Sequence, residues 1–588
     1  AQLLRVHGRG VGLQPDFTIL DRADTADLLN LVRGELIKTG ERKRFARKET
    51  LADIYSRTVN ASAPLRDTLE RWYPWCADDR EEIAAVFTAY TTRKRGCHLL
   101  DYDDLLLYWH ALLTSPPGAR VAERFDHVLV DEYQDVNGTQ AQILMALHRS
   151  ASSIFVVGDD AQAIYSFRSA TVEHILAFPN TFAGSRVVVL EQNYRSTAPL
   201  VTASNAVIAL ARERHEKTLT TSRPGGARPA LITCRDEAAQ CDAVCESVLR
   251  SREAGVPLRR QAVLFRTSHH SDALEVELSR RNIPFVKYGG LKFLEAAHVK
   301  DVIAILRVLD NPRDAVSWYR VLQLLDGIGP AHAARVLATI GVNTGGSSRS
   351  PLRNLIDDEP DVPESARGPL AALRLLLDQL TDERDPLPAA AQIERVRHFC
   401  EPVFARLYGN AEVRLRDIEQ LEVVAAASPS RTAFLTDLAL DPPSATSDLA
   451  GDPLLDEDYL ILSTIHSAKG GEWDAVRIIH AADGMIPSDM ATGDAGSIEE
   501  ERRLLYVAMT RARDQLEVYF PLRYYRRPRR LDDAHTYAQL TRFIPESLRD
   551  LFDVRTAGDV VLSDDTGTVD QAGDAAVVDR FLQALWAG

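Results

Sequence analysis

The sequence predicts a mixed α/β protein with two lobes built on parallel sheets, each lobe interrupted by a mainly helical insertion. Short runs rich in valine, isoleucine and leucine recur along the chain, and most of them end in a polar residue. Near-continuous apolar strands of this kind are typical of parallel sheets that are buried on both faces. The 588 residues of the chain also exceed the ~250–300 residues that one hydrophobic core accommodates, so several domains are expected.

The strands are expected where these apolar runs occur. The runs are residues 127–131 (HVLVD), 153–159 (SIFVVGD), 186–191 (RVVVLE), 262–267 (AVLFRT), 459–466 (YLILSTIH), 475–481 (AVRIIHA) and 515–520 (QLEVYF). Ligands of open α/β sheets bind beyond the carboxyl ends of the strands. The polar residues that end these runs are therefore the first candidates for chemistry.

Two long stretches, 20–125 and 296–455, carry helix-like patterns and few strand signals. They divide the chain into five expected parts. These are a first lobe (1–20 and 126–196), its helical insertion (21–125), a second lobe (197–295 and 456–550), its helical insertion (296–455) and an acidic C-terminal tail (551–588).

Charge and composition narrow the function classes. The net charge of −15 argues against a protein that coats duplex DNA, because lysine and arginine supply phosphate affinity. It is compatible with a protein that grips a short single strand by stacking its bases on aromatic side chains. The basic run RYYRRPRR at 523–530 is either such a contact or a solvated linker. Cys241 and Cys245 have no CxxC or histidine at ligand spacing, so buried thiols are expected there instead of a metal site.

The run VLVDEYQD at 128–135 places two adjacent carboxylates at the end of an apolar strand. Asp131 is suited to hold the Mg²⁺ of a nucleotide, and Glu132 is suited to polarise an attacking water. Phosphoryl transfer needs both functions. The alternative is a solvated strand end without chemistry.

The segment GDDAQAIYSFRSA at 158–170 follows the next strand. Gln162 could contact a terminal phosphate, and Tyr165 and Phe167 could stack on nucleic-acid bases. The alternative is that both aromatic rings belong to the hydrophobic core.

Three further segments complete the candidate chemistry. LEQNYRS at 190–196 and STIHSAKGGEWDAV at 463–476 each close a strand, and EEERRLLYVAMTRARD at 499–514 is expected to form an amphipathic helix. Arg511 of that helix could project into a nucleotide cleft, where an arginine finger contributes ~10³–10⁵ in rate. Taken singly, each arginine could instead form a surface ion pair.

In order, DEYQD, GDxxQxIYxFR, NYRS, HSAKGxEW and ERRLLYVAMTRA resemble the motif series of UvrD/Rep/PcrA-type superfamily 1 helicases. The resemblance covers roughly residues 1–550. It implies two RecA-like lobes, the first incomplete, with ATP and Mg²⁺ bound between them and 3′→5′ movement on single-stranded DNA.

The resemblance also implies site residues. For the nucleotide it implies Asp131 as metal ligand, Glu132 as base, Gln162, Arg195 and Arg511 at the terminal phosphate, Tyr194 on adenine and Glu472 near the ribose. For DNA it implies Tyr165, Phe167, Arg266 and His466 along the track, and Gly327 and Gly329 of a GIGP turn that resembles a helix-hairpin-helix contact to duplex phosphates. The expected partners are single-stranded DNA and its junctions with duplex, with repair or replication proteins as further candidates. A monomer in the bacterial cytoplasm, associated with the nucleoid and not with a membrane, is expected.

One departure from the family is serious. The sequence has no Gly-Lys dipeptide and thus no GxxxxGK[ST] phosphate-binding loop. We therefore expect an N-terminally truncated form of an intact helicase, inactive without the missing segment and with an exposed edge on its first sheet. Two alternatives stay open, an ATPase-dead relative that binds DNA or a partner, and a helicase subunit of a RecB- or AddA-like helicase–nuclease. The short region after the last motif leaves no room for a nuclease domain.

Overall fold

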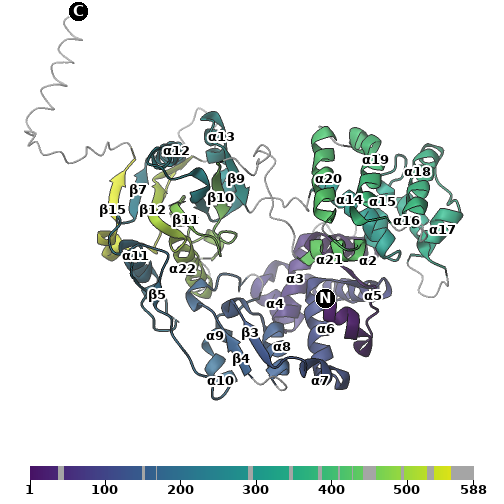
Figure 1. Ribbon diagram of the computed structural model, residues 1–588, viewed down its shortest axis with the longest axis horizontal. Coiled ribbons are helices and arrows are strands. Elements are labelled where there is room, and N and C mark those ends of the chain that lie inside the picture. Colours follow the sequence, from purple (N-terminus) through teal and green to yellow (C-terminus); the bar gives the residue numbers. More distant parts are fainter. Residues whose placement is uncertain are drawn as a thin grey trace, which may run out of the picture.

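The computed structural model describes most of the 588-residue chain (Figure 1). The described residues are 1–37, 45–148, 153–166, 169–212, 214–288, 296–342, 349–381, 387–407, 411–426, 428–440, 458–491, 495–525 and 535–557.

The second lobe is built on a seven-stranded sheet in which all pairs of neighbouring strands are parallel. In spatial order its strands are β15 (Asp553–Thr556), β7 (Ala230–Cys234), β12 (Ala512–Pro521), β11 (Trp473–Ile478), β8 (Gln261–Phe265), β10 (Leu460–Thr464) and β9 (Phe285–Tyr288). The parallel sheet that the apolar runs predict is confirmed here. Strand β15 lies inside the stretch expected to be a tail, so that boundary was wrong. Its four residues, with no apolar run, gave no strand signal in the sequence.

Both faces of this sheet are covered by helices (Figure 1). The sequence of strand β8 is almost wholly apolar because both of its faces are buried against helices. Ala262 and Leu264 pack into the core that includes α11 (Ala198–Ala209) and α22 (Ala495–Met509). Val263 and Phe265 point to the opposite core, which includes α12 (Glu237–Glu253) and α13 (Asp272–Arg280). Successive side chains of a strand alternate between faces, and here both faces are buried.

The first lobe contains a two-stranded parallel sheet of β3 (His127–Val130) and β4 (Ser153–Val156). Its other elements are η3 (Tyr133–Asp135), α8 (Gly138–His148), η4 (Asp160–Gln162), α9 (Glu173–Leu176) and α10 (Phe178–Thr181). The sheet carries exposed apolar side chains, with Leu129 76% and Phe155 60% exposed. One face of the lobe therefore presents apolar surface that no described residue covers.

The strand expected at 186–191 is not formed. Residues 186–191 have no strand pairing, and only β5 (Gln192–Asn193) follows, paired with β6 (Thr220–Thr221). Leu190 is 77% exposed and Val188 66% exposed. An apolar run becomes a strand only where a neighbouring strand satisfies its backbone groups. Here the described residues provide such a bond only at the end of the run, from Thr220 N to the Glu191 carbonyl (2.8 Å).

The expected helix over 499–514 ends earlier than its sequence pattern suggested. Helix α22 stops at Met509, and β12 begins at Ala512. Arg511 therefore lies in the turn between a helix and a strand. Its backbone carbonyl accepts a hydrogen bond from Trp473 N (3.0 Å), so the parallel pairing of β12 with β11 already competes with helical hydrogen bonds at this point.

The first helical region begins at the N-terminus and ends before β3. It comprises α1 (Gln2–His7), η1 (Gly8–Val11), β1 (Thr18–Ile19), α2 (Arg22–Leu36), α3 (Lys48–Asn60), α4 (Leu65–Trp72), η2 (Pro74–Asp79), α5 (Arg80–Gly96), β2 (Leu99–Leu100), α6 (Tyr102–Thr114) and α7 (Pro116–Ala122). Capping boxes set two of its helix starts. Asp21 and Asp24 exchange side-chain and backbone hydrogen bonds at α2, and Asp101 and Asp104 do so at α6.

The second helical region lies between β9 and β10 in the chain. It comprises α14 (Ala297–Asp310), α15 (Ala315–Gln323), α16 (Pro330–Ile340), α17 (Pro351–Asp357), α18 (Glu364–Leu380), α19 (Ala389–Leu407), α20 (Ala411–Ala426) and α21 (Arg431–Leu440). The remaining elements are η6 (Leu258–Arg260), η7 (Ser268–Ser271), η9 (Asp489–Ala491), η10 (Glu546–Leu551) and the antiparallel pair β13 (Arg523–Tyr525) and β14 (His535–Tyr537). Of the basic run 523–530, only 523–525 is among the described residues.

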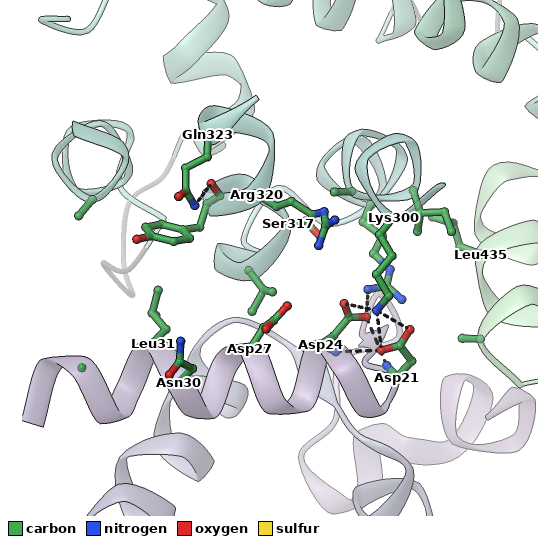
Figure 2. A pocket seen from close by; sticks show the side chains of 18 of the residues that line it. Asp21, Asp24, Asp27, Asn30, Leu31, Lys300, Ser317, Arg320, Gln323 and Leu435 are labelled. Atoms are coloured by element: carbon green, nitrogen blue, oxygen red, sulfur yellow. Dashed lines mark hydrogen bonds and ion pairs between the residues drawn. The ribbon is translucent and has the colours of Figure 1, made fainter. Parts of the chain in front are cut away.

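The two helical regions share one hydrophobic core. Buried residues of α2, α3 and α5 join those of α14, α15 and α21 in a single cluster. Helix α2 contacts α15, and α21 contacts α14 (Figure 1). At one end, Asp24 pairs with Lys300 and Arg307. Figure 2 shows the ion pairs of Lys300 with Asp21 and Asp24. They lie at a cavity of about 570 Å³ that is lined mainly by α2, α14, α15 and α21. The acidic N-terminus of α2 thus faces two buried cations of α14.

Among the described helices, none has a stretch both long and apolar enough to cross a membrane.

Candidate functional site

Two carboxylates follow β3 at its carboxyl end. Asp131 and Glu132 are exposed, and Asp131 Oδ1 accepts a hydrogen bond from the Glu132 backbone N–H (2.9 Å). Glu132 has φ +51°, in the left-handed region that few non-glycine residues adopt. Gln134 donates a hydrogen bond to the Glu132 carboxylate. The strand end therefore presents two exposed acidic groups, one of them in a strained backbone conformation.

Lys469 connects this strand end to the second lobe. It lies in the turn after β10, is 7% exposed, and pairs with Asp135. Its Nζ also donates to the Gln162 carbonyl (2.9 Å) and lies 3.7 Å from Glu132 Oε2. The ammonium group of Lys469 thus contacts a carboxylate, Asp135, and a backbone carbonyl, that of Gln162, in the first lobe.

Gln162 is held between two partners. Its Nε2 donates to Asp159 Oδ2 (2.7 Å), and its Oε1 accepts from Arg511 Nη2 (3.3 Å). Arg511 is 3% exposed and also donates to the carbonyls of Val507 (3.1 Å) and Gly471 (3.3 Å). Burial, with the nearby Arg195 cation, lowers the pKa of Arg511 to about 10. Among the described residues this guanidinium donates to neutral oxygens and to no carboxylate, so it is suited to meet an anionic ligand.

A second arginine lies on the same side. Arg195 Nε pairs with Glu472 Oε2 (2.5 Å), and its Nη1 donates to the Thr510 carbonyl (3.1 Å). Glu472 also accepts from Arg513 Nη1 (2.9 Å). The hydrogen bond from Arg195 lowers the pKa of Glu472 below its ordinary value. Tyr194, which precedes Arg195 in the chain, is 77% exposed and offers a flat aromatic surface.

The structure describes the surroundings of some of the residues predicted to contact DNA. Tyr165 is half-buried, its hydroxyl donates to the His466 carbonyl (3.1 Å), and Lys469 Nζ lies 5.0 Å from its ring centroid. Arg266 is paired with Glu501 (2.7 Å). Phe167 lies outside the described residues.

The GIGP turn joins α15 to α16 in the second helical region. Gly327 has φ +79°, and a Cβ there would lie 2.3 Å from Ser365 Oγ, so only glycine fits without a shift. Gly329 is the N-cap residue of α16.

Around Gln162, the structure brings together side chains that the sequence selected from segments far apart in the chain. Gln162 contacts Arg511, and Arg195 contacts Glu472. Lys469 and Asp135 were missed as individual residues although their motifs, HSAKG and DEYQD, were recognised. The adjacent acidic signal of DEYQD could have suggested a cationic partner.

Comparison with known proteins agrees with this arrangement. A family model described as the UvrD/REP helicase N-terminal domain matches residues 1–183, and a model described as the UvrD-like helicase C-terminal domain matches residues 188–344 and 432–520. The chain belongs to the UvrD-like helicase family.

Individual relatives extend over most of the chain. DNA helicase II of Escherichia coli is 30% identical over 563 residues, covering 93% of this chain and 75% of the relative. The ATP-dependent DNA helicase UvrD1 of Mycobacterium tuberculosis is 32% identical over 540 residues, covering 86% and 69% respectively. The ATP-dependent DNA helicase PcrA of Bacillus subtilis is 28% identical over 521 residues, again covering 86% and 69%.

Proposed function

We propose that this protein is an ATP-dependent helicase that moves 3′→5′ along single-stranded DNA and acts in DNA repair or replication. The observation that carries the proposal is the arrangement around Gln162. Gln162 of the first lobe donates to Asp159 and accepts a hydrogen bond from Arg511 of the second lobe. Arg195, at the end of the first lobe, pairs with Glu472 of the second lobe. Hydrolysis at such a boundary would couple the terminal phosphate to the relative position of the lobes.

The residues present fit the acidic and cationic parts of a Mg²⁺–ATP site. Asp131 would hold the metal, which when bound neutralises phosphate charge. Glu132 would polarise the attacking water, and Arg195 and Arg511 would stabilise the charge that develops on the phosphoryl group. Tyr194 would stack on adenine, and Glu472 would approach the ribose. The phosphate cradle is not represented, since the sequence holds no GxxxxGK[ST] loop.

For DNA, we propose a track that runs past Tyr165, Phe167, Arg266 and His466, with Gly327 and Gly329 at a duplex junction. In the structure Arg266 is engaged by Glu501, so DNA would have to compete for its guanidinium. The five-part division into two lobes, two insertions and a tail is part of the same proposal, with β15 (553–556) assigned to the second lobe.

The first test is single-strand-stimulated release of phosphate from ATP. It is measured on residues 1–588 and on the same chain preceded by a phosphate-binding segment of the GxxxxGK[ST] type, each with an Arg511→Ala control. Turnover that needs single-stranded DNA and Arg511 supports the proposal. A chain that carries the loop and binds DNA without any turnover would instead favour an ATPase-dead binding protein.

Direction and activity class are tested with partial duplexes. Unwinding of a duplex with a 3′ single-stranded tail, and not of one with a 5′ tail, is expected. DNA affinity should fall with salt, with a slope of about −0.7 per phosphate contacted. Metal-dependent nicking of either strand would point to a helicase–nuclease.

A further inference from the structure

The segment that follows α11 in the second lobe lies against the turn that carries Gln162. Lys217 is the centre of this contact. Its Nζ pairs with Asp159 and with Asp160 Oδ1 (2.7 Å), and the lysine side chain is only 16% exposed. The resemblance and the motifs assign no role to Lys217.

The contact is anchored on both sides. Asp160 is 1% exposed, and its second oxygen accepts from the His215 backbone N–H (3.1 Å). On the other side, Leu219 and Asn205 of α11 exchange hydrogen bonds, since Asn205 Nδ2 donates to the Leu219 carbonyl (2.8 Å). Lys217 is therefore held by a segment that is itself hydrogen-bonded to α11.

Asp159 links Lys217 to Gln162 through its two carboxylate oxygens. Its Oδ1 accepts from the Ala161 backbone N–H (3.0 Å) in addition to Lys217, and its Oδ2 accepts from Gln162 Nε2 (2.7 Å). The side-chain amide of glutamine has two N–H donors and one oxygen acceptor. With one N–H on Asp159 and the oxygen on Arg511, the amide plane of Gln162 is set, and one N–H is left to meet a phosphate oxygen.

We propose that Lys217 is a positioning residue for Gln162, acting through Asp159, and this inference rests on the proposed function. Lys217 fixes the turn and also neutralises part of the charge on Asp159. Without that cation, two adjacent carboxylates would repel each other in a largely buried turn, and Asp159 would hold the Gln162 amide more strongly against a competing phosphate oxygen.

The charge state of Lys217 is consistent with this role. Burial alone would lower the pKa of Lys217, but the carboxylates of Asp159 and Asp160 outweigh burial and raise it above its ordinary value. The lysine is therefore charged at neutral pH.

The experiment compares Lys217→Met, which keeps the length of the side chain and removes the charge, with Lys217→Arg, which keeps the charge. Lys287→Met is the matched control, because Lys287 is also a buried lysine of the second lobe, paired with Glu275 (2.5 Å). Hydrogen exchange of peptides that cover residues 158–165 is read first. Exchange in Lys217→Met should be about tenfold faster than in the unaltered chain. Lys217→Arg and Lys287→Met should exchange at nearly the same rate as the unaltered chain. Unchanged exchange in Lys217→Met would overturn the inference.

The second readout is steady-state hydrolysis in the chain that carries the phosphate-binding loop. Lys217→Met should lower kcat about tenfold and change KM for ATP less than about twofold, because the lost alignment acts on the terminal phosphate. Added to Gln162→Ala, Lys217→Met should lower kcat no further. Faster exchange with an unchanged kcat would reduce Lys217 to a structural role and overturn the inference. A complete lack of turnover in the unaltered chain would refute the proposed function instead, and the exchange result would still decide whether Lys217 holds the turn.

Discussion

Arg511 of the second lobe donates a hydrogen bond to the side-chain oxygen of Gln162, which belongs to a first-lobe segment, over 3.3 Å. The guanidinium is buried and has a lowered pKa of about 10. A cation that is costly to bury is thus kept next to an amide, and an anionic ligand at this boundary would recover part of that cost.

Arg511→Lys is expected to lower single-strand-stimulated turnover at least about a hundredfold, because a lysine cannot reproduce the forked donors of a guanidinium. The loss should deepen as the pH rises, since lysine starts from a lower pKa than arginine and the same burial lowers it further. Phosphate release between pH 7 and 9 checks this. Arg260→Lys, at an exposed pair with Asp474, is the control and should change turnover little. A substituted enzyme with normal turnover would remove Arg511 from the phosphate site.

Glu132→Gln is expected to abolish hydrolysis and leave nucleotide binding within about threefold, because the neutral amide keeps the shape of the side chain but cannot accept a proton. The positive φ of Glu132 is a backbone property, so the substitution should not relax it. Turnover and binding of a fluorescent nucleotide are measured side by side. Glu173→Gln, at an exposed position of α9, is the control. Residual turnover near the normal rate would show that another group is the base.

Tyr165→Ala is expected to weaken binding of single-stranded DNA by one stacking interaction, about 1–3 kcal/mol. Tyr165→Phe keeps the ring and loses only the hydrogen bond to the His466 carbonyl, so it should bind almost normally. Fluorescence anisotropy with a labelled oligonucleotide distinguishes the two. Equal DNA affinity of the unaltered chain and both variants would mean that Tyr165 does not stack on DNA. Its ring would then serve only in packing against the second-lobe cluster.

The second-lobe sheet was predictable from the sequence because strands such as β8 and β10 are mainly apolar on both faces. The mainly apolar residues of β8 and β10 predict by themselves that these strands are buried. Residues 186–191 look just as apolar, yet they form no strand among the described residues. Whether a run finds a partner depends on other segments, and a single run does not contain that information.

The site was predictable to the extent that its chemistry is concentrated in short motifs. Asp131, Glu132 and Gln162 could be selected because their neighbours along the chain are informative. Lys217 could not, because an isolated lysine in a polar segment gives no signal until the fold places it against Asp159 and Asp160. The common core of the two helical regions was missed for the same reason, since amphipathic helices do not specify their partners.

Asp24→Asn is expected to destabilise that common core by about 3–5 kcal/mol, because it removes one partner of a buried ion cluster and leaves Arg307 without full compensation. Burial favours the neutral form of Asp24, but Arg307 and Lys300 outweigh it and hold its pKa well below the ordinary range. Urea unfolding followed by hydrogen exchange of α2 and α14 measures the loss. Asp53→Asn, at an exposed pair with Arg22, should cost less than about 1 kcal/mol. Similar losses for both would mean that the buried cluster contributes no more than a surface pair.

His480→Asn is expected to make the second lobe less sensitive to acid. His480 follows β11, is 4% exposed, and has φ +57°. Its ring contacts the His270 carbonyl (3.1 Å) and the Tyr524 hydroxyl (3.0 Å). Burial lowers the pKa of His480 from 6.5 to about 4. The unfolded chain therefore takes up a proton near pH 6.5, whereas the folded chain does so only near pH 4.

The direction in which stability changes with pH follows from this difference in proton uptake. Stability is at its full value above pH 6.5, and it is lost as the pH falls from 6.5 towards 4, by up to about 1.4 kcal/mol per pH unit for this one residue. Asparagine does not titrate and tolerates a positive φ, so the substitution should remove about 2 kcal/mol of the difference in stability between pH 7.5 and pH 5. His98→Asn is the matched control, because His98 also has a positive φ (+53°) but lies at a partly exposed pair with Asp16. Urea unfolding followed by hydrogen exchange of β11 at both pH values reports the effect. An identical pH dependence in His480→Asn and the unaltered chain would mean that His480 becomes protonated in the folded state near its ordinary pKa, and that its burial does not contribute to acid sensitivity.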